Sequence, residues 1–102
     1  MKLIIVTTVQ AFHKDAIKLF KKAGIESFSV SEIGGYKNSS GVSMTESWFG
    51  SERSGNESSM LFSFTNESQV DMLFDLIKAF NLEQKETNNP LRAIVVPIEK
   101  YI

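Results

Sequence analysis

The spacing of apolar residues changes from that of a strand to that of a helix twice along this chain, in the same order each time. Residues 3–6 form a short β-branched-rich run, and from residue 11 to 23 the apolar residues recur at intervals of three and four. Residues 60–64 again form an apolar run, and a helical stripe follows over residues 70–80. Each half therefore predicts a strand followed by a helix.

A further strand is predicted after each helix. Gly24 is placed to cap the first helix, and residues 25–33 then alternate between apolar and polar side chains. Asn66, with a glutamine three residues later, suits the start of the second helix, and Asn81 can end it. Residues 93–98 give the last strand, with a proline near its end, where a missing N–H donor costs least.

This β-α-β, β-α-β order predicts an α+β protein with a ferredoxin-like βαββαβ fold. Such a fold has a four-stranded antiparallel sheet with both helices on one face. With 102 residues, the chain suits one domain covering residues 1–102. Strands this rich in Ile, Val and Phe need cover on the sheet's other face as well, so we expect an oligomer.

A long polar segment, residues 37–59, joins the second predicted strand to the third. It contains eight Ser and three Gly, and structureless loops longer than about 12 to 15 residues in compact domains are often binding loops or lids. Alternating residues between Val42 and Trp48 equally suit an extended hairpin, whose tip would be residues 50–58. Both interpretations present the tip to a binding partner.

Three residues of this segment are candidates for contact with a partner protein, namely Trp48, Phe49 and Arg53. Tryptophan and arginine are the residue types that often dominate interface energies. The alternative for Trp48 and Phe49 is packing against a neighbouring subunit.

Charge and composition exclude several function classes. The net charge of −1 gives no broad field for binding nucleic acid, and the chain has no cysteine for a disulfide or a zinc finger. No apolar run approaches the roughly 20 residues of a membrane span, and the start of the chain lacks a signal-peptide cleavage site. We therefore expect a cytoplasmic protein that does not insert into membranes.

Candidates for catalysis are few. His13 is the one imidazole, and we expect it in the first turn of the first helix, exposed to solvent. The loop glutamates lack a calcium-binding spacing, so no metal site is predicted. A basic helix side, made by Lys14, Lys18, Lys21 and Lys22, is expected to be solvated, with contact to an acidic partner as the alternative.

The chain resembles the PII-type signal-transduction proteins, the nitrogen regulatory family and its relatives. The resemblance covers most of the sequence. It rests on Gly24-Ile25, on Ser29-Val30-Ser31-Glu32-Ile33 followed by Gly35-Tyr36, on the long loop after them, and on Ile94-Val95-Val96-Pro97-Ile98-Glu99.

The resemblance implies a non-enzymatic homotrimer with adenine-nucleotide sites in the clefts between subunits. Ser29, Gly35 and Arg92 would border the effector, and Gly34-Gly35 would form a bend at the base of the loop. The loop of residues 37–59 would engage a client protein, either a membrane transporter or an enzyme. One departure bears on the effector: the family's glycine-rich turn is replaced by residues 87–91, Thr-Asn-Asn-Pro-Leu.

Two alternatives stay open from the sequence. CutA proteins share the fold and the trimer, and Val6-Thr7-Thr8 together with Ser47-Trp48-Phe49-Gly50 is similar to their strand and aromatic hairpin, although their cysteine-bearing segment is absent. A small ferredoxin-like enzyme, using a cavity between sheet and helices, is the other.

Overall fold

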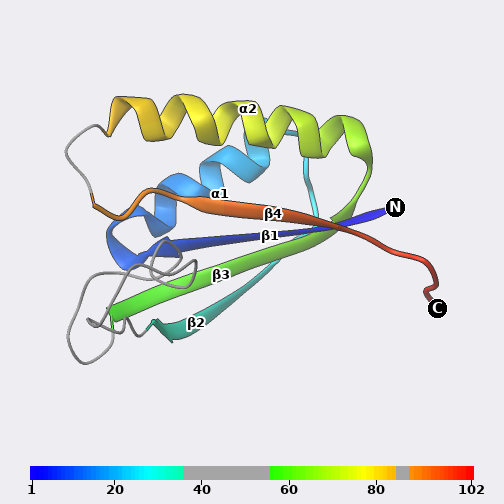
Figure 1. The fold of residues 1–102 in the computed structure, drawn as a ribbon, viewed down its shortest axis with the longest axis horizontal. Coiled ribbons are helices and arrows are strands. Elements are labelled where there is room, and N and C mark those ends of the chain that lie inside the picture. The colour runs from blue at the N-terminus through cyan, green and yellow to red at the C-terminus, as the bar shows by residue number, and fades with distance from the viewer. Residues whose placement is uncertain (36–55, 85–87) are drawn as a thin grey trace, which may run out of the picture.

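The computed structural model describes residues 1–35, 56–84 and 88–102, which form one four-stranded sheet and its helices (Figure 1). The elements in chain order are β1 (Lys2–Val9), the 3-10 turn η1 (Gln10–Phe12), α1 (His13–Lys22), β2 (Ser29–Gly35), β3 (Asn56–Thr65), α2 (Glu67–Glu83) and β4 (Arg92–Pro97). The strand order is β2-β3-β1-β4, and all neighbouring strands are antiparallel. This confirms the predicted ferredoxin-like fold.

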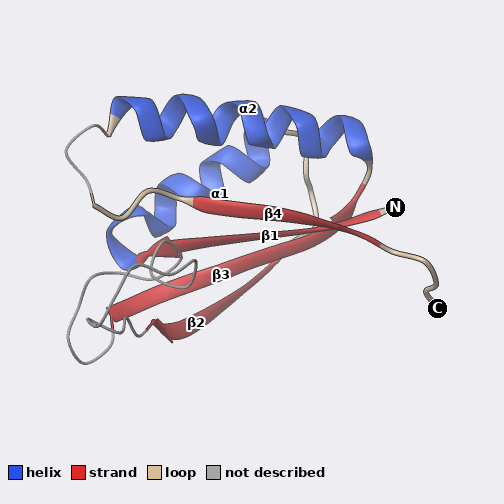
Figure 2. Ribbon diagram, viewed as in Figure 1, coloured by secondary structure: helices blue, strands red, loops and turns tan. Residues whose placement is uncertain are grey.

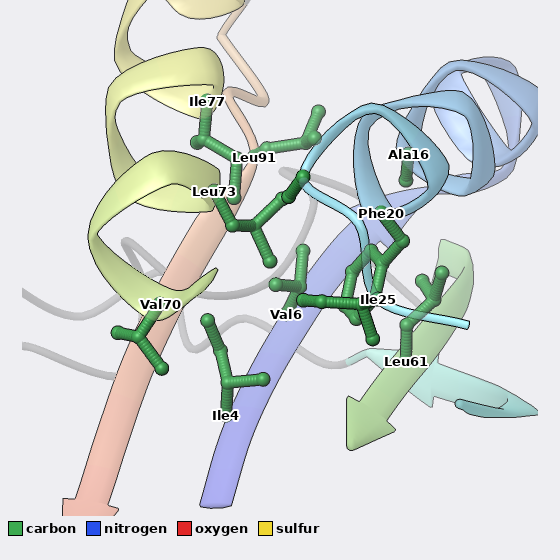
Figure 3. Packing of buried hydrophobic residues seen from close by; sticks show 11 residues of the cluster. Ile4, Val6, Ala16, Phe20, Ile25, Leu61, Val70, Leu73, Ile77 and Leu91 are labelled. Carbon is green, nitrogen blue, oxygen red and sulfur yellow. The ribbon is translucent and has the colours of Figure 1, made fainter. Parts of the chain in front are cut away.

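Both helices lie on the same side of the sheet (Figure 2). The core fills the space between them and the sheet, where Ile4 and Val6 of β1 meet Phe20 of α1 and Leu73 of α2, all without solvent exposure (Figure 3). Burial of such side chains contributes roughly 1.5 to 3 kcal/mol each, so this layer supplies most of the driving force for folding.

Gly24 ends α1 as predicted. It adopts a φ of +79°, the left-handed conformation that glycine tolerates best. The Gly24 N–H donates to the Lys21 carbonyl at 3.0 Å, and the Ile25 N–H donates to the Phe20 carbonyl at 3.1 Å. This pair of bonds is a Schellman motif, which satisfies carbonyl groups left free at the helix end.

The predicted start of β2 at residue 25 was wrong, because the strand begins at Ser29 and ends at Gly35. Ile25 takes part in the helix cap and is 2% exposed, so it belongs to the core and not to the sheet. Phe28 likewise packs against Phe20, with ring centroids 4.9 Å apart.

The predicted bend at Gly34-Gly35 is also corrected by the structure. Both residues lie within β2 and pair in register with Glu57 and Asn56 of β3. Among the described glycines, Gly24 is the one with positive φ. Because β3 begins at Asn56, the last four residues of the predicted 37–59 excursion belong to the sheet.

The predicted N-cap of α2 is confirmed, but its predicted end was wrong. The Asn66 side chain accepts a hydrogen bond from the Gln69 N–H at 2.9 Å. The helix passes Asn81 and continues to Glu83. Asn81 instead forms two hydrogen bonds with the backbone of Leu91, described below.

Candidate functional site

The sheet face that points away from the helices is apolar, and we call it the open face. Strand register places the following side chains there: Leu3, Ile5, Met60, Phe62, Phe64, Ile94 and Val96. Phe64 is 60% exposed, and Ile94 and Val96 are each 39% exposed. A monomer rarely leaves so large a continuous apolar surface in water, so this face has the character of an interface.

Two phenylalanines are the largest side chains of the open face. Phe62 and Phe64, two residues apart on β3, project to the same side of the sheet. Their rings meet edge to face with centroids 6.3 Å apart. This geometry is favourable for aromatic pairs, and it leaves the rings available for contact with another chain.

All three predicted effector residues occupy open-face positions. Ser29 pairs with Phe62, and Arg92 pairs with Thr7 in the row next to Ile5 and Ile94. Gly35 has the same parity as Ser29 along β2, and side-chain directions alternate along a strand. A molecule bound at any of these positions would therefore lie where a second chain can reach it.

One subunit alone does not bring these residues together. Ser29 and Gly35 are six residues apart on one extended strand, a separation of about 20 Å. Arg92 lies on β4, at the opposite edge of the sheet, three strand spacings or about 14 Å from β2. A site that used all three would need residues from more than one chain.

A hollow of about 570 Å³ lies beside Ser29. Its lining is Glu26, Ser27, Phe28, Ser29, Phe62, Ser63 and Phe64. The Ser63 hydroxyl donates to the Ser27 carbonyl at 2.6 Å, which fixes the chain just before β2. The phenylalanines provide apolar walls that could contact a planar ring.

A second hollow, of about 320 Å³, lies where β2 ends and β3 begins. Gln10, Glu32, Ile33, Gly34, Glu57 and Ser58 line it. Glu32 and Glu57 are the charged groups among these described residues, so the hollow repels an anion. Strand register puts Glu32 and Glu57 on the helix side of the sheet, opposite to Gly35, so this repulsion does not act on the open face.

The backbone before Arg92 is held by Asn81. The Leu91 N–H donates to Asn81 Oδ1 and the Asn81 side-chain amide donates to the Leu91 carbonyl, both at 3.0 Å. The amide thus imitates a neighbouring strand and fixes where β4 starts. The Leu91 N–H is occupied by this bond, so it is not available as a donor to phosphate.

His13 is not the solvent-exposed side chain that we expected. It is half-buried, and its Nδ1 lies 2.7 Å from the hydroxyl of Ser59, which is fully buried on β3. A serine beside a histidine has the atoms of a catalytic pair, but a nucleophile without solvent exposure cannot reach a substrate. The contact joins α1 to the first half of β3.

The predicted partner-binding residues Trp48, Phe49 and Arg53 lie outside the described residues. Within the described part of the chain, no three His, Cys, Asp or Glu side chains gather as metal ligands would. Neither of the two described α-helices has the combination of length and hydropathy that a membrane span requires.

Comparison with solved structures identifies the fold. The chain is similar to CPII, a nitrogen regulatory PII-like protein from Thiomonas intermedia K12 bound to ADP, AMP and bicarbonate, with a TM-score of 0.61 and 16% identity over 99% of this chain and 94% of that one. A structure of CPII bound to ADP and bicarbonate gives a TM-score of 0.60 and 15% identity, covering 97% and 88% of the two chains.

A putative PII-like signaling protein from Thermus thermophilus is also similar, with a TM-score of 0.59 and 12% identity over 93% of this chain and 83% of that one. No family model and no curated protein matches the sequence. The described residues therefore have the fold of these PII-like proteins, as the sequence predicted, at a sequence identity of 12 to 16%.

Proposed function

We propose that this protein is a divergent PII-like regulator that senses a small effector and controls a client protein without catalysing a reaction. The observation that carries the proposal is the PII-like fold combined with an apolar open face on which all three candidate effector residues lie. The sequence adds the long segment between β2 and β3, which is suited to contact with a partner.

The proposed assembly is a homotrimer built on the open face. Phe64 and its neighbours would be buried between chains, since obligate interfaces resemble the apolar core of a domain. The helices would then lie on the outside. Such an arrangement also supplies the second chain that a site shared by Ser29, Gly35 and Arg92 requires.

The proposed effector is an adenine nucleotide bound between subunits. Support comes from CPII, which binds ADP, AMP and bicarbonate. In this chain the aromatic hollow beside Ser29 suits a base, and the guanidinium of Arg92 suits a phosphate.

The proposed output is the segment of residues 37–59, with Trp48, Phe49 and Arg53 as the contact residues for the client. A transporter or an enzyme of the cytoplasmic side is the expected client. Binding of the effector would favour one arrangement of this segment over another, because a ligand shifts an equilibrium toward the state that it binds more tightly.

Isothermal titration of the purified chain with ADP, AMP, ATP and bicarbonate tests the effector site. We expect binding by at least one adenine nucleotide, and we expect Arg92→Ala to weaken it about tenfold or more, the usual cost of a lost charged hydrogen bond. Lys100→Ala, an exposed cation beyond β4, is the matched control and should bind normally. Absence of binding at millimolar nucleotide, or equal binding by Arg92→Ala, would contradict the proposal.

A further inference from the structure

A groove lies between the two helices, on the side of the molecule away from the open face. Its volume is about 640 Å³, and its lining is Asp15, Lys18, Leu19, Lys21, Lys22, Leu76, Ala79, Phe80 and Glu83. Both helices lie on the other side of the sheet (Figure 2). The groove between them therefore stays accessible when the open face is covered.

Each helix contributes the same spacing of residues to the groove. Asp15, Lys18, Leu19 and Lys22 follow the i, i+3, i+4, i+7 pattern on α1, and Leu76, Ala79, Phe80 and Glu83 follow it on α2. Residues at this spacing lie along one helix face. The groove is therefore a straight channel about 10 Å long, which matches two turns of a third helix.

Apolar side chains form the floor of the groove, and charged side chains lie toward its two ends. Leu19, Leu76, Ala79 and Phe80 form the floor, and Ala79 is exposed to solvent. The helices run in opposite directions, and Phe12, just before α1, packs against Phe80 near the end of α2 with centroids 5.4 Å apart (Figure 1). Asp15 and Glu83 therefore lie toward one end of the groove and the lysines toward the other.

The charge at the basic end is not neutralised by an ion pair with any residue that the structure describes. Lys18, Lys21 and Lys22 are all exposed, and none forms an ion pair in the described part of the chain. Lys21 and Lys22 lie in the last turn of α1, where their positive charge interacts favourably with the negative end of the helix dipole. This interaction stabilises the helix and still allows their ammonium groups to contact a partner. Three cations beside an apolar floor are complementary to a ligand with acidic and apolar groups.

We propose that this groove binds an acidic amphipathic helix of a partner protein. Two or three apolar side chains of that helix, spaced by three and four residues, would lie on the floor, and acidic side chains would meet Lys18, Lys21 and Lys22. The concave shape favours this occupant over a flat anionic membrane. The proposal uses neither the effector site nor residues 37–59, so it stands independently of the proposed function.

Fluorescence anisotropy with a pair of designed peptides tests the proposal on the full chain. The acidic peptide is a labelled 18-residue helix with leucine at i, i+3, i+4 and i+7 and glutamate on both flanks, and the matched basic peptide has lysine at each glutamate position. We expect the acidic peptide to bind at least about tenfold more tightly, and its affinity to fall as salt rises from low to physiological concentration. Equal binding, or no binding of the acidic peptide, would overturn the proposal.

Variants locate the binding surface. Reversal of three charges in Lys18→Glu/Lys21→Glu/Lys22→Glu should weaken the acidic peptide about tenfold or more, whereas Lys78→Glu, on the far side of α2, should not. Ala79→Gln fills the floor without changing charge and should also weaken binding, while Ala11→Gln, at an exposed alanine outside the groove, should not. Circular dichroism confirms that each variant is folded.

Two further results would overturn the proposal. One is normal peptide binding by both the triple lysine variant and Ala79→Gln. The other is sedimentation of the chain with vesicles of phosphatidylglycerol and phosphatidylcholine, lost in the triple variant, without any preference for the acidic peptide. That outcome would assign the lysines to a membrane surface.

Discussion

Among the described residues, Gly24 is the one whose backbone conformation most restricts substitution. Its φ of +79° is unfavourable for any residue with a Cβ, although a Cβ built there would meet only the Gln69 amide at an ordinary 3.6 Å. We therefore expect Gly24→Ala to lower the free energy of unfolding by about 1 to 2 kcal/mol through backbone strain alone. Urea unfolding measures this. Gly34→Ala, at an extended position, is the control, and an equal loss there would contradict the explanation.

Asn81 is a second residue whose replacement should lower the stability of the protein. Its amide makes both hydrogen bonds that hold Leu91, which is 2% exposed, at the start of β4. Asn81→Ala removes both partners and should cost about 1 to 3 kcal/mol in thermal or chemical unfolding. Asn81→Asp keeps the acceptor for the Leu91 N–H and should retain part of that stability. If the alanine variant were as stable as the wild type, the two hydrogen bonds would make no net contribution to the free energy of unfolding, which would contradict the prediction.

At the scale of elements, the start of α2 depends on Asn66 and Gln69. Asn66 caps the helix, and the Gln69 side chain contacts Thr65 and donates to the Gly24 carbonyl at 2.7 Å. These bonds join the first turn of α2 to the end of α1. The two helix termini are thus stabilised together.

Replacement of the cap tests how far α2 depends on it. We expect Asn66→Ala to destabilise the protein by about 1 kcal/mol, because one N–H of the first turn loses its acceptor. Asn66→Ser supplies another oxygen in the same place and should restore most of the loss. Unfolding midpoints of the three proteins decide the matter, and a serine variant no better than the alanine variant would count against the cap.

The existence and type of each strand and helix were predicted better than the residues at which each one begins and ends. The change of apolar period located all four strands and both helices, since the core requires those side chains on one face. The ends of β2 and α2 depend on contacts that periodicity does not report. Ile25 is used by a helix cap, and Asn81 bonds Leu91 ten residues further on.

In the candidate site too, the local sequence pattern predicts some features, and contacts between distant residues determine the others. Alternation along β2 is enough to put Ser29 and Gly35 on one face, but Arg92 joins that face only through its pairing with Thr7. The contact of His13 with Ser59 spans 46 residues, and no local pattern announces it. The groove between the helices was not predicted, although contact of its lysines with an acidic partner was the stated alternative, because lysines suit a solvated helix side equally well.

For the whole molecule, a charge placed on the open face should prevent assembly. Phe64 is 60% exposed in the single chain, so Phe64→Glu should fold normally as a monomer but lose the subunit contact. Met72→Glu, at a 51% exposed position on α2, is the matched control and should leave assembly unchanged. Gel filtration with light scattering distinguishes them, and an unchanged mass for Phe64→Glu would place the interface elsewhere.

The solution mass of the unmodified chain tests the central claim most directly. Sedimentation equilibrium at micromolar concentrations should give three times the chain mass of 11.4 kDa, because the open face needs cover and the effector site needs a neighbouring chain. A mass of one chain at every concentration would leave the open face in water and Ser29, Gly35 and Arg92 apart, and it would contradict the account.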